Sequence, residues 1–134
     1  MRVKLKDILD ALDMTDDSSE AFLNKRTGEI EWIAEYMDSD EREEVSERLD
    51  EDGFIRLPTQ FDIHEYEIMR DFVETLSGSP KDWLADALTG RGAFQRFKRG
   101  IRRFGIEQDW YDYRDSAYRQ IAEEWCQDNG LEFS

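Results

Sequence analysis

Apolar residues recur every three or four positions through much of this chain, which is the spacing of one buried face of an α-helix. The first such face predicts a short amphipathic helix over residues 4–13; its apolar members are Leu5, Ile8, Leu9 and Leu12. Equivalent faces predict four further helices in the second half of the chain, over residues 62–76, 80–88, 94–104 and 107–128. A glycine follows each of them within two residues, as is typical after the last turn of a helix.

The period changes to two between residues 21 and 33, where Ile30 and Trp32 alternate with two glutamates. This alternation predicts a β-hairpin with one buried and one solvated face. Gly28 lies in its turn and suits a positive φ there. Residues 53–58, which end in a proline, predict a third strand beside the hairpin.

The order of these elements predicts an α+β fold, in which a small antiparallel sheet (the hairpin plus a third strand) packs against a helical C-terminal half. The acidic residues 35–52 are compatible with a weak helix, a loop or a partly disordered segment. A length of 134 residues predicts one domain over residues 1–134.

The start of the helix over residues 62–76 carries a capping pattern. Asp62 is a favourable N-cap, and Glu65 three positions later completes a capping box. Phe61 and Tyr66 are spaced for a hydrophobic staple across this start. In the helix over 94–104, we expect Gly100 to cost about 1 kcal/mol relative to alanine.

The chain is strongly acidic, and this limits the partners that it can bind. The chain has 33 acidic and 18 basic residues, for a net charge of -15, which argues against non-specific binding to nucleic acid or anionic membranes. A single cysteine permits no intramolecular disulfide and fits a reducing compartment. The N-terminus does not resemble a signal peptide, and no segment is apolar enough to span a bilayer. We therefore expect a cytoplasmic protein, monomeric or dimeric, that does not enter membranes.

Positive charge is concentrated in residues 90–105, which hold six bases and no acid: Arg91, Arg96, Lys98, Arg99, Arg102 and Arg103. This arc of the helix can dock a phosphate, a nucleic acid or an acidic partner, or it can pair with acids elsewhere in the chain. The opposite arc, Phe94, Phe97, Ile101 and Phe104, is expected in the core, and charge reversal at Arg96, Arg99 and Arg103 is expected to spare the fold. Aromatic crowding in residues 110–113 predicts an exposed ring, Tyr113 or Tyr111.

The residues that usually carry catalysis are sparse. His64 is the only histidine, and without a second histidine or a cysteine cluster it predicts no zinc site. Cys126 follows Trp125 in an aromatic helix and is expected to be a buried apolar residue rather than a nucleophile. We expect no metal site, no cofactor and no catalytic residues.

Several phrases together resemble a bacterial family that is known only as an uncharacterised protein family. They are residues 22–24 (FLN), 27–29 (TGE), 62–69 (DIHEYEIM), 90–98 (GRGAFQRFK), 109–111 (DWY) and 121–126 (IAEEWC). The resemblance runs in order over nearly the whole chain. It implies a bacterial or bacteriophage origin and a small single domain, and it brings no activity and no site residues.

These observations favour a non-enzymatic acidic interaction or regulatory protein that binds another protein, itself acidic, through the basic and aromatic helix. The candidate binding residues are Arg91, Arg96, Lys98, Arg99, Arg102, Arg103 and Tyr113. One alternative is an inhibitor that mimics DNA charge and blocks a nucleic-acid-binding protein. Another is an RNA- or nucleotide-binding protein that uses the basic helix. Random duplex DNA is not expected to bind.

Overall fold

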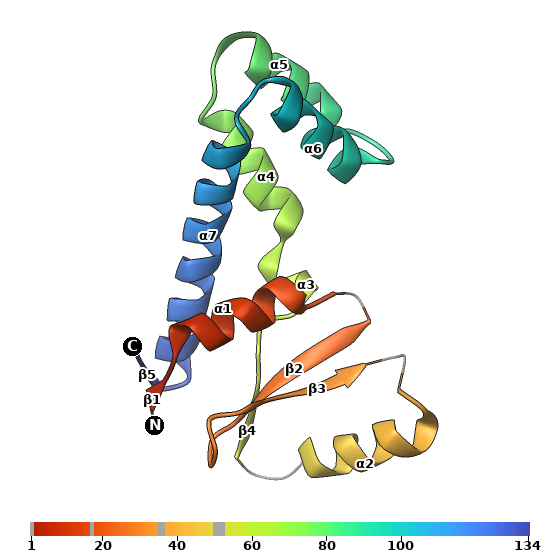
Figure 1. Cartoon of the computed structure of the whole chain (residues 1–134), viewed down its shortest axis with the longest axis vertical. Helices are drawn as coiled ribbons and strands as arrows, with labels where there is room; N and C mark the ends of the chain where they lie inside the picture. The colour runs from red at the N-terminus through yellow and green to blue at the C-terminus, as the bar shows by residue number, and fades with distance from the viewer. Residues whose placement is uncertain (1, 17, 35–36, 50–52) are drawn as a thin grey trace. The chain divides into compact units, whose positions relative to one another are not determined.

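The computed structural model describes residues 2–16, 18–34, 37–49 and 53–134, and they form two compact units. Unit 1 comprises Met1–Ile63 and Tyr118–Ser134, and unit 2 comprises His64–Ala117. The α+β class is confirmed: a three-stranded antiparallel sheet precedes a C-terminal half that is largely helical (Figure 1). The expectation of one domain stays a prediction.

Unit 1 holds the sheet and three of the shorter helices. Its complete elements are β1 (Arg2–Val3), α1 (Leu5–Met14), β2 (Ser19–Asn24), β3 (Ile30–Ala34), α2 (Ser39–Leu49), β4 (Phe54–Arg56), α3 (Gln60–Ile63) and β5 (Glu132–Phe133). The last part of α7 (Glu107–Asp128), from Tyr118 on, also belongs to unit 1. Strand β2 is central in the order β3-β2-β4. The acidic segment whose structure the sequence left open therefore contains a helix, α2. Strands β1 and β5 pair in parallel, and this pairing brings the two ends of the chain together (Figure 1).

The predicted hairpin is present, but the prediction of one buried and one solvated face in β3 was wrong: Glu31 and Ile33 are half-buried, as Ile30 and Trp32 are. Leu23 of β2 is fully buried and lies between Ile30 of β3 and Ile55 of β4. Ile30 and Trp32 are only half-buried, because β3 is an edge strand and has a neighbour on one flank. Gly28 has a φ of 79°, as its place in the turn predicted.

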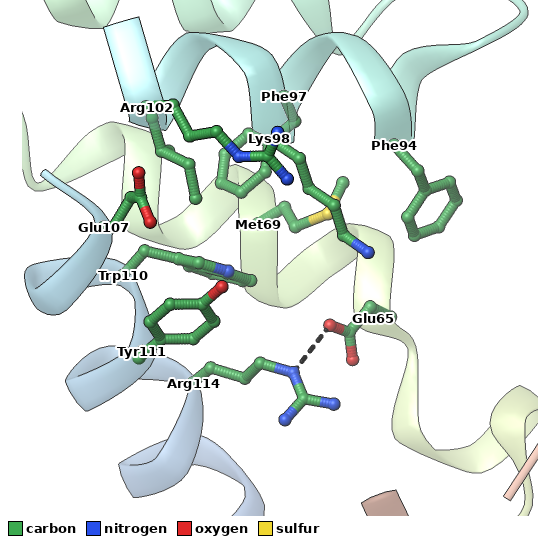
Figure 2. Close-up of a pocket in the computed structure, with 11 residues that line it drawn as sticks. Glu65, Met69, Phe94, Phe97, Lys98, Arg102, Glu107, Trp110, Tyr111 and Arg114 are labelled. Carbon is green, nitrogen blue, oxygen red and sulfur yellow. Dashed lines mark hydrogen bonds and ion pairs between the residues drawn. The ribbon is translucent and has the colours of Figure 1, made fainter. Parts of the chain in front are cut away.

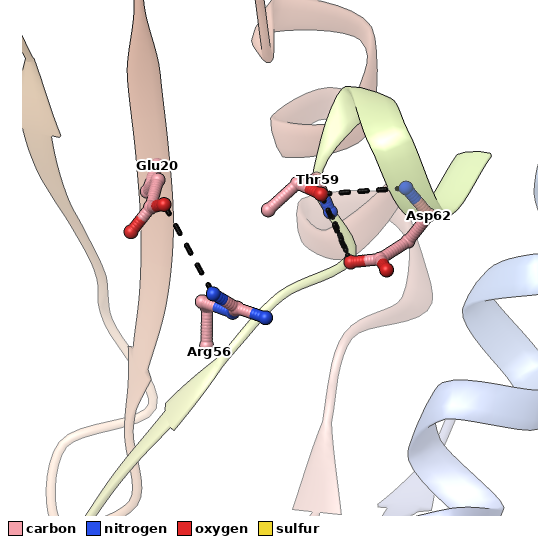
Figure 3. Close-up of polar contacts among 4 residues, drawn as sticks. All are labelled: Glu20, Arg56, Thr59 and Asp62. Carbon is pink, nitrogen blue, oxygen red and sulfur yellow. Dashed lines mark hydrogen bonds and ion pairs between the residues drawn. The ribbon is translucent and has the colours of Figure 1, made fainter. Parts of the chain in front are cut away.

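The capping prediction at Asp62 was wrong by one turn. Thr59 and Asp62 form the reciprocal pair instead. The Thr59 backbone N–H and hydroxyl donate to the Asp62 carboxylate at 2.9 and 3.0 Å, and the Asp62 backbone N–H donates to the Thr59 hydroxyl oxygen at 3.3 Å (Figure 3). Asp62 thus closes the start of α3. The next helix begins after His64, whose left-handed φ of 55° separates the two. The Phe61 side chain lies outside the described residues, so the staple has no outcome here.

Unit 2 is built from α4 (Glu65–Glu74), α5 (Gly78–Ala87), α6 (Ala93–Arg103) and the first part of α7 (Glu107–Asp128). Its core centres on aromatic rings. Phe72 of α4 contacts Phe97 of α6 and Trp110 of α7, with ring centroids 6.4 and 5.4 Å apart, and Phe97 meets Trp110 edge-on at 4.8 Å. These contacts fix the faces that α4, α6 and α7 turn toward one another.

Helices α5 and α6 pack closely at Gly100. A Cβ atom built on Gly100 would lie 2.3 Å from Cζ3 of Trp83 and 2.6 Å from Cδ2 of Leu84. No real Cβ contact is that short, so only glycine fits there without movement of α5. The residue expected to weaken α6 is therefore the one that allows α6 to pack.

The predicted core face of α6 is only partly correct. Phe97 and Ile101 are 0% and 2% exposed, whereas Phe104 is half-buried and Phe94 is 49% exposed. Phe94 lies in the first turn of α6, and its ring extends past the core made by α4 and α7 (Figure 2). An apolar ring therefore lies on the surface beside the basic residues.

Candidate functional site: a groove beside α6

Unit 2 contains a groove of about 360 Å³ between α4, α6 and the first turns of α7 (Figure 2). We call it the α6 groove. It is lined by Glu65, Met69, Phe94, Phe97, Lys98, Ile101, Arg102, Glu107, Trp110, Tyr111 and Arg114. Three helices contribute, and all lining residues lie within His64–Ala117.

The floor of the α6 groove is apolar. Met69, Phe97, Ile101 and Trp110 are each at most 3% exposed. Two rings remain open to solvent at the edges: Phe94 is 49% exposed and Tyr111 is 51% exposed. A ligand that covers both rings would therefore remove apolar surface from water, which is the main favourable term in most association.

Two cations of α6 stand over this floor. Lys98 and Arg102 are four residues apart, so they lie one above the other on the same side of the helix, and both side chains extend from α6 toward the groove (Figure 2). On the opposite wall, the Arg114 guanidinium donates to Glu65 at 3.0 Å, with both side chains largely buried. The groove thus combines two exposed cations with an internally matched ion pair.

The predicted basic residues divide into two groups. Arg91, Lys98, Arg99, Arg102 and Arg103 are exposed, and none of these five makes an ion pair within 4.0 Å in the part of the chain that the structure describes. We call these five the α6 basic surface. Pairing with acids elsewhere in the chain, the alternative interpretation of this stretch, is not seen among those residues.

Arg96 forms the second group. Its guanidinium donates to the backbone carbonyl oxygens of Ala87, at 3.1 Å, and of Thr89 and Arg91. These are the last carbonyls of α5 and the loop that follows it. Charge reversal at Arg96 would leave them without their donor, so, unlike the sequence alone, the structure predicts that a variant including Arg96 is destabilised. Arg103 has a further contact, 5.8 Å from the ring centroid of Trp83.

Of the two tyrosines, Tyr111 is the one that lines the groove. Tyr113 is half-buried, and its ring lies 5.4 Å from that of Phe72. Sequence reasoning predicted an exposed ring in this turn without deciding which. It missed Met69, Phe94, Glu107 and Arg114 as groove residues, because their proximity depends on how three helices pack.

The other chemistry-bearing residues lie apart from the groove lining. His64 is exposed at the break before α4. Cys126 is fully buried in unit 1, and burial, with a smaller contribution from Glu123, raises the pKa of its thiol. Within the described ranges, no group of three or more His, Cys, Asp or Glu side chains is arranged to hold a metal ion. None of the helices searched in those ranges has the length and apolar character that a bilayer span requires.

Comparison with known proteins identifies a family and a relative, and neither name states an activity. The family model for "Uncharacterised protein family (UPF0158)" matches residues 1–134. A curated relative, a UPF0158 protein of Pseudomonas aeruginosa, is 32% identical over 68 residues, which cover 48% of this chain and 44% of the relative. The match therefore spans less than half the length of that relative. No solved structure shows significant similarity to the chain.

Proposed function

The chain belongs to the uncharacterised protein family UPF0158, and we propose that it is a non-enzymatic interaction protein that binds an acidic partner protein through α6. The observation that carries this proposal is the α6 basic surface: five exposed cations with no ion pair among the described residues, in a chain with a net charge of -15. With 33 acids available, the sequence places none between residues 90 and 105.

The net negative charge of the whole molecule does not prevent such binding. At physiological ionic strength, exposed charges are largely screened beyond about 8 Å. An acidic segment that contacts α6 would therefore interact mainly with the local cations and only weakly with acids on distant surfaces. A long polyanion extends further and would meet those acids as well. This difference favours a discrete acidic protein over a nucleic acid.

The exposed aromatic rings support a protein partner. Phe94 and Tyr111 lie beside Lys98 and Arg102, and aromatic residues together with arginine are enriched in the buried centre of protein interfaces. Charges alone give specificity and association rate more than affinity. The neighbouring apolar surface supplies the affinity that a purely electrostatic patch lacks.

The test is affinity capture from the native host with three forms of the full chain, followed by direct binding of the purified captured protein. The first is the unaltered chain, and the second carries Lys98→Glu, Arg99→Glu and Arg102→Glu. Arg96 is left intact because of its carbonyl contacts. The third is a control with the same change in net charge at exposed residues elsewhere, Lys4→Glu, Lys25→Glu and Arg70→Glu.

We expect an acidic protein to be retained by the unaltered chain and by the control, and lost from the α6 variant. Circular dichroism establishes that all three forms are folded. Equal retention of every captured protein by the three forms would contradict the proposal. So would captured nucleic acid that depends on α6.

A further inference from the structure

We propose that the α6 groove receives one large apolar side chain from an acidic peptide segment, while Lys98 and Arg102 bind the carboxylates that flank it. This inference rests on the proposed function and specifies the chemistry of the partner. The occupant is a peptide with an aromatic or large aliphatic residue between acidic residues.

The apolar side chains of the groove favour a large apolar residue in the peptide. At about 360 Å³, the groove lies toward the small end of protein ligand sites, which span about 300–1,000 Å³. That space suits one large side chain rather than a whole helix. Phe94 and Tyr111 stand at the edges, where each can cover a side of the inserted group.

The two cations favour acidic residues on either side of the inserted side chain. Cβ atoms four residues apart on a helix lie about 5–6 Å from each other, so Lys98 and Arg102 present two separate positive groups along the groove. Acidic residues on either side of an inserted side chain can each reach one of them. Arg102 can hold a carboxylate through two parallel hydrogen bonds, whereas Lys98 acts as a compact charge on a flexible stem.

The remaining charges distinguish a peptide from a nucleotide or nucleic acid. Glu107 lines the same groove, and Arg114 is already engaged by Glu65. A polyphosphate would meet two available cations and the carboxylate of Glu107 within one small site. A peptide brings single carboxylates together with backbone N–H groups, and Glu107 can accept a hydrogen bond from one of them. The mixed charges of the groove therefore favour a peptide.

The test uses a set of fluorescein-labelled heptapeptides with Asp or Glu at six positions and a varied central residue: Trp, Phe, Leu, Ala or Ser. Binding to the full chain is followed by fluorescence anisotropy. We expect the peptides with Trp, Phe or Leu to bind at least about tenfold more tightly than those with Ala or Ser, since burying a large apolar side chain contributes that much or more.

Matched variants locate the binding. Phe94→Ala and Tyr111→Ala remove exposed rings and should leave the chain folded, and each should reduce the preference for a central Trp or Phe about three- to tenfold. Lys98→Glu with Arg102→Glu should abolish binding of every peptide. Arg99→Glu changes a neighbouring exposed cation that does not line the groove, so it should keep the preference for an apolar centre.

The outcomes separate this inference from the proposed function. Acidic peptides that bind equally well whatever their central residue, and that still depend on Lys98 and Arg102, would overturn the groove as the receptor and leave the acidic partner in place. No binding by any acidic peptide would overturn both. A single-stranded oligonucleotide that competes at the groove with higher affinity than the peptides would also overturn the peptide as its occupant.

Discussion

Gly100 suits its position better than alanine would, although helix propensity alone favours alanine. In an isolated helix, replacing glycine with alanine is favourable by about 1 kcal/mol. In unit 2, however, the added Cβ would lie 2.3 Å from the Trp83 ring and 2.6 Å from Leu84. Because these contacts are with packed side chains of α5, the two helices would have to separate. The cost of overpacking therefore outweighs the gain in propensity.

We expect Gly100→Ala to lower the free energy of unfolding by about 1–3 kcal/mol, as overpacking of a core typically does. Urea denaturation followed by circular dichroism measures the change. Gln95→Ala, at an exposed position of the same helix, is the control and should leave stability unchanged within about 0.5 kcal/mol. A stabilised Gly100→Ala protein would show that α5 and α6 are not in close contact in solution.

We expect the stability of the chain to depend on pH through Cys126. Burial raises the pKa of its thiol above the ordinary value, so the folded chain holds this proton more tightly than the unfolded chain. The contribution to stability is thus fully present below the unfolded thiol's pKa, about 8.5, and is lost as the pH rises through the higher folded pKa. We expect the free energy of unfolding to fall more steeply above pH 8.5 in the unaltered chain than in Cys126→Ala. Parallel pH profiles would contradict this.

Among the elements, α6 shows what the helical spacing of apolar residues can and cannot predict. The spacing of Phe94, Phe97, Ile101 and Phe104 located the helix to within one residue at each end. It also identified Phe97 and Ile101 as core. It could not show that Phe94 is left 49% exposed, because the length of a buried face depends on its neighbours in space.

Phe97 and Phe94 therefore offer a matched comparison within one helix. We expect Phe97→Ala to cost about 3–5 kcal/mol, because Phe97 is fully buried and contacts the rings of both Phe72 and Trp110. Phe94→Ala, at a 49% exposed position, should cost about 1 kcal/mol or less. Thermal melts of the two variants decide the matter. Equal losses would mean that Phe94 is covered in solution, for example by a second copy of the chain.

Local patterns predicted local structure well in this chain. The hairpin pairs Leu23 with Ile30 only seven residues apart, and its turn glycine adopts the positive φ that was expected. By contrast, β1 and β5 pair residues 2–3 with residues 132–133, and two-residue strands carry no period that a sequence can show. The start of α3 failed for a different reason: Thr59-Asp62 and Asp62-Glu65 are both plausible capping pairs, and only the fold selects between them.

The sequence predicted the positive charge of the candidate site but not its shape. The concentration of bases in residues 90–105 pointed to α6 as a surface of interest. The groove itself needs Glu65 and Met69 from α4 together with Trp110 and Tyr111 from α7, a juxtaposition set by tertiary packing. The same limit explains Arg96, which the sequence groups with its basic neighbours although the fold gives it three backbone carbonyl acceptors.

At the scale of the whole molecule, the excess of acids decides which polyanions can reach α6. Non-specific duplex binding depends on the release of counterions as several lysines and arginines neutralise phosphates at once. The α6 basic surface offers five cations, but the α6 groove beside it also holds Glu107, and the chain as a whole carries a net charge of -15. A rigid duplex would therefore gain few contacts and would experience repulsion along its length.

We accordingly expect no measurable affinity for random duplex DNA at physiological salt, with a dissociation constant weaker than about 10⁻⁴ M, the weak end of ordinary non-specific binding. Fluorescence anisotropy with a labelled duplex of random sequence measures this, and a titration at lower salt extends the range. The Lys98→Glu, Arg99→Glu, Arg102→Glu variant serves as the control. Micromolar binding that weakens steeply with salt and disappears in this variant would show that the five cations act on phosphates despite the surrounding acids. In that case, local charge would outweigh the charge of the whole chain, and α6 would have to be reinterpreted as a nucleic-acid surface.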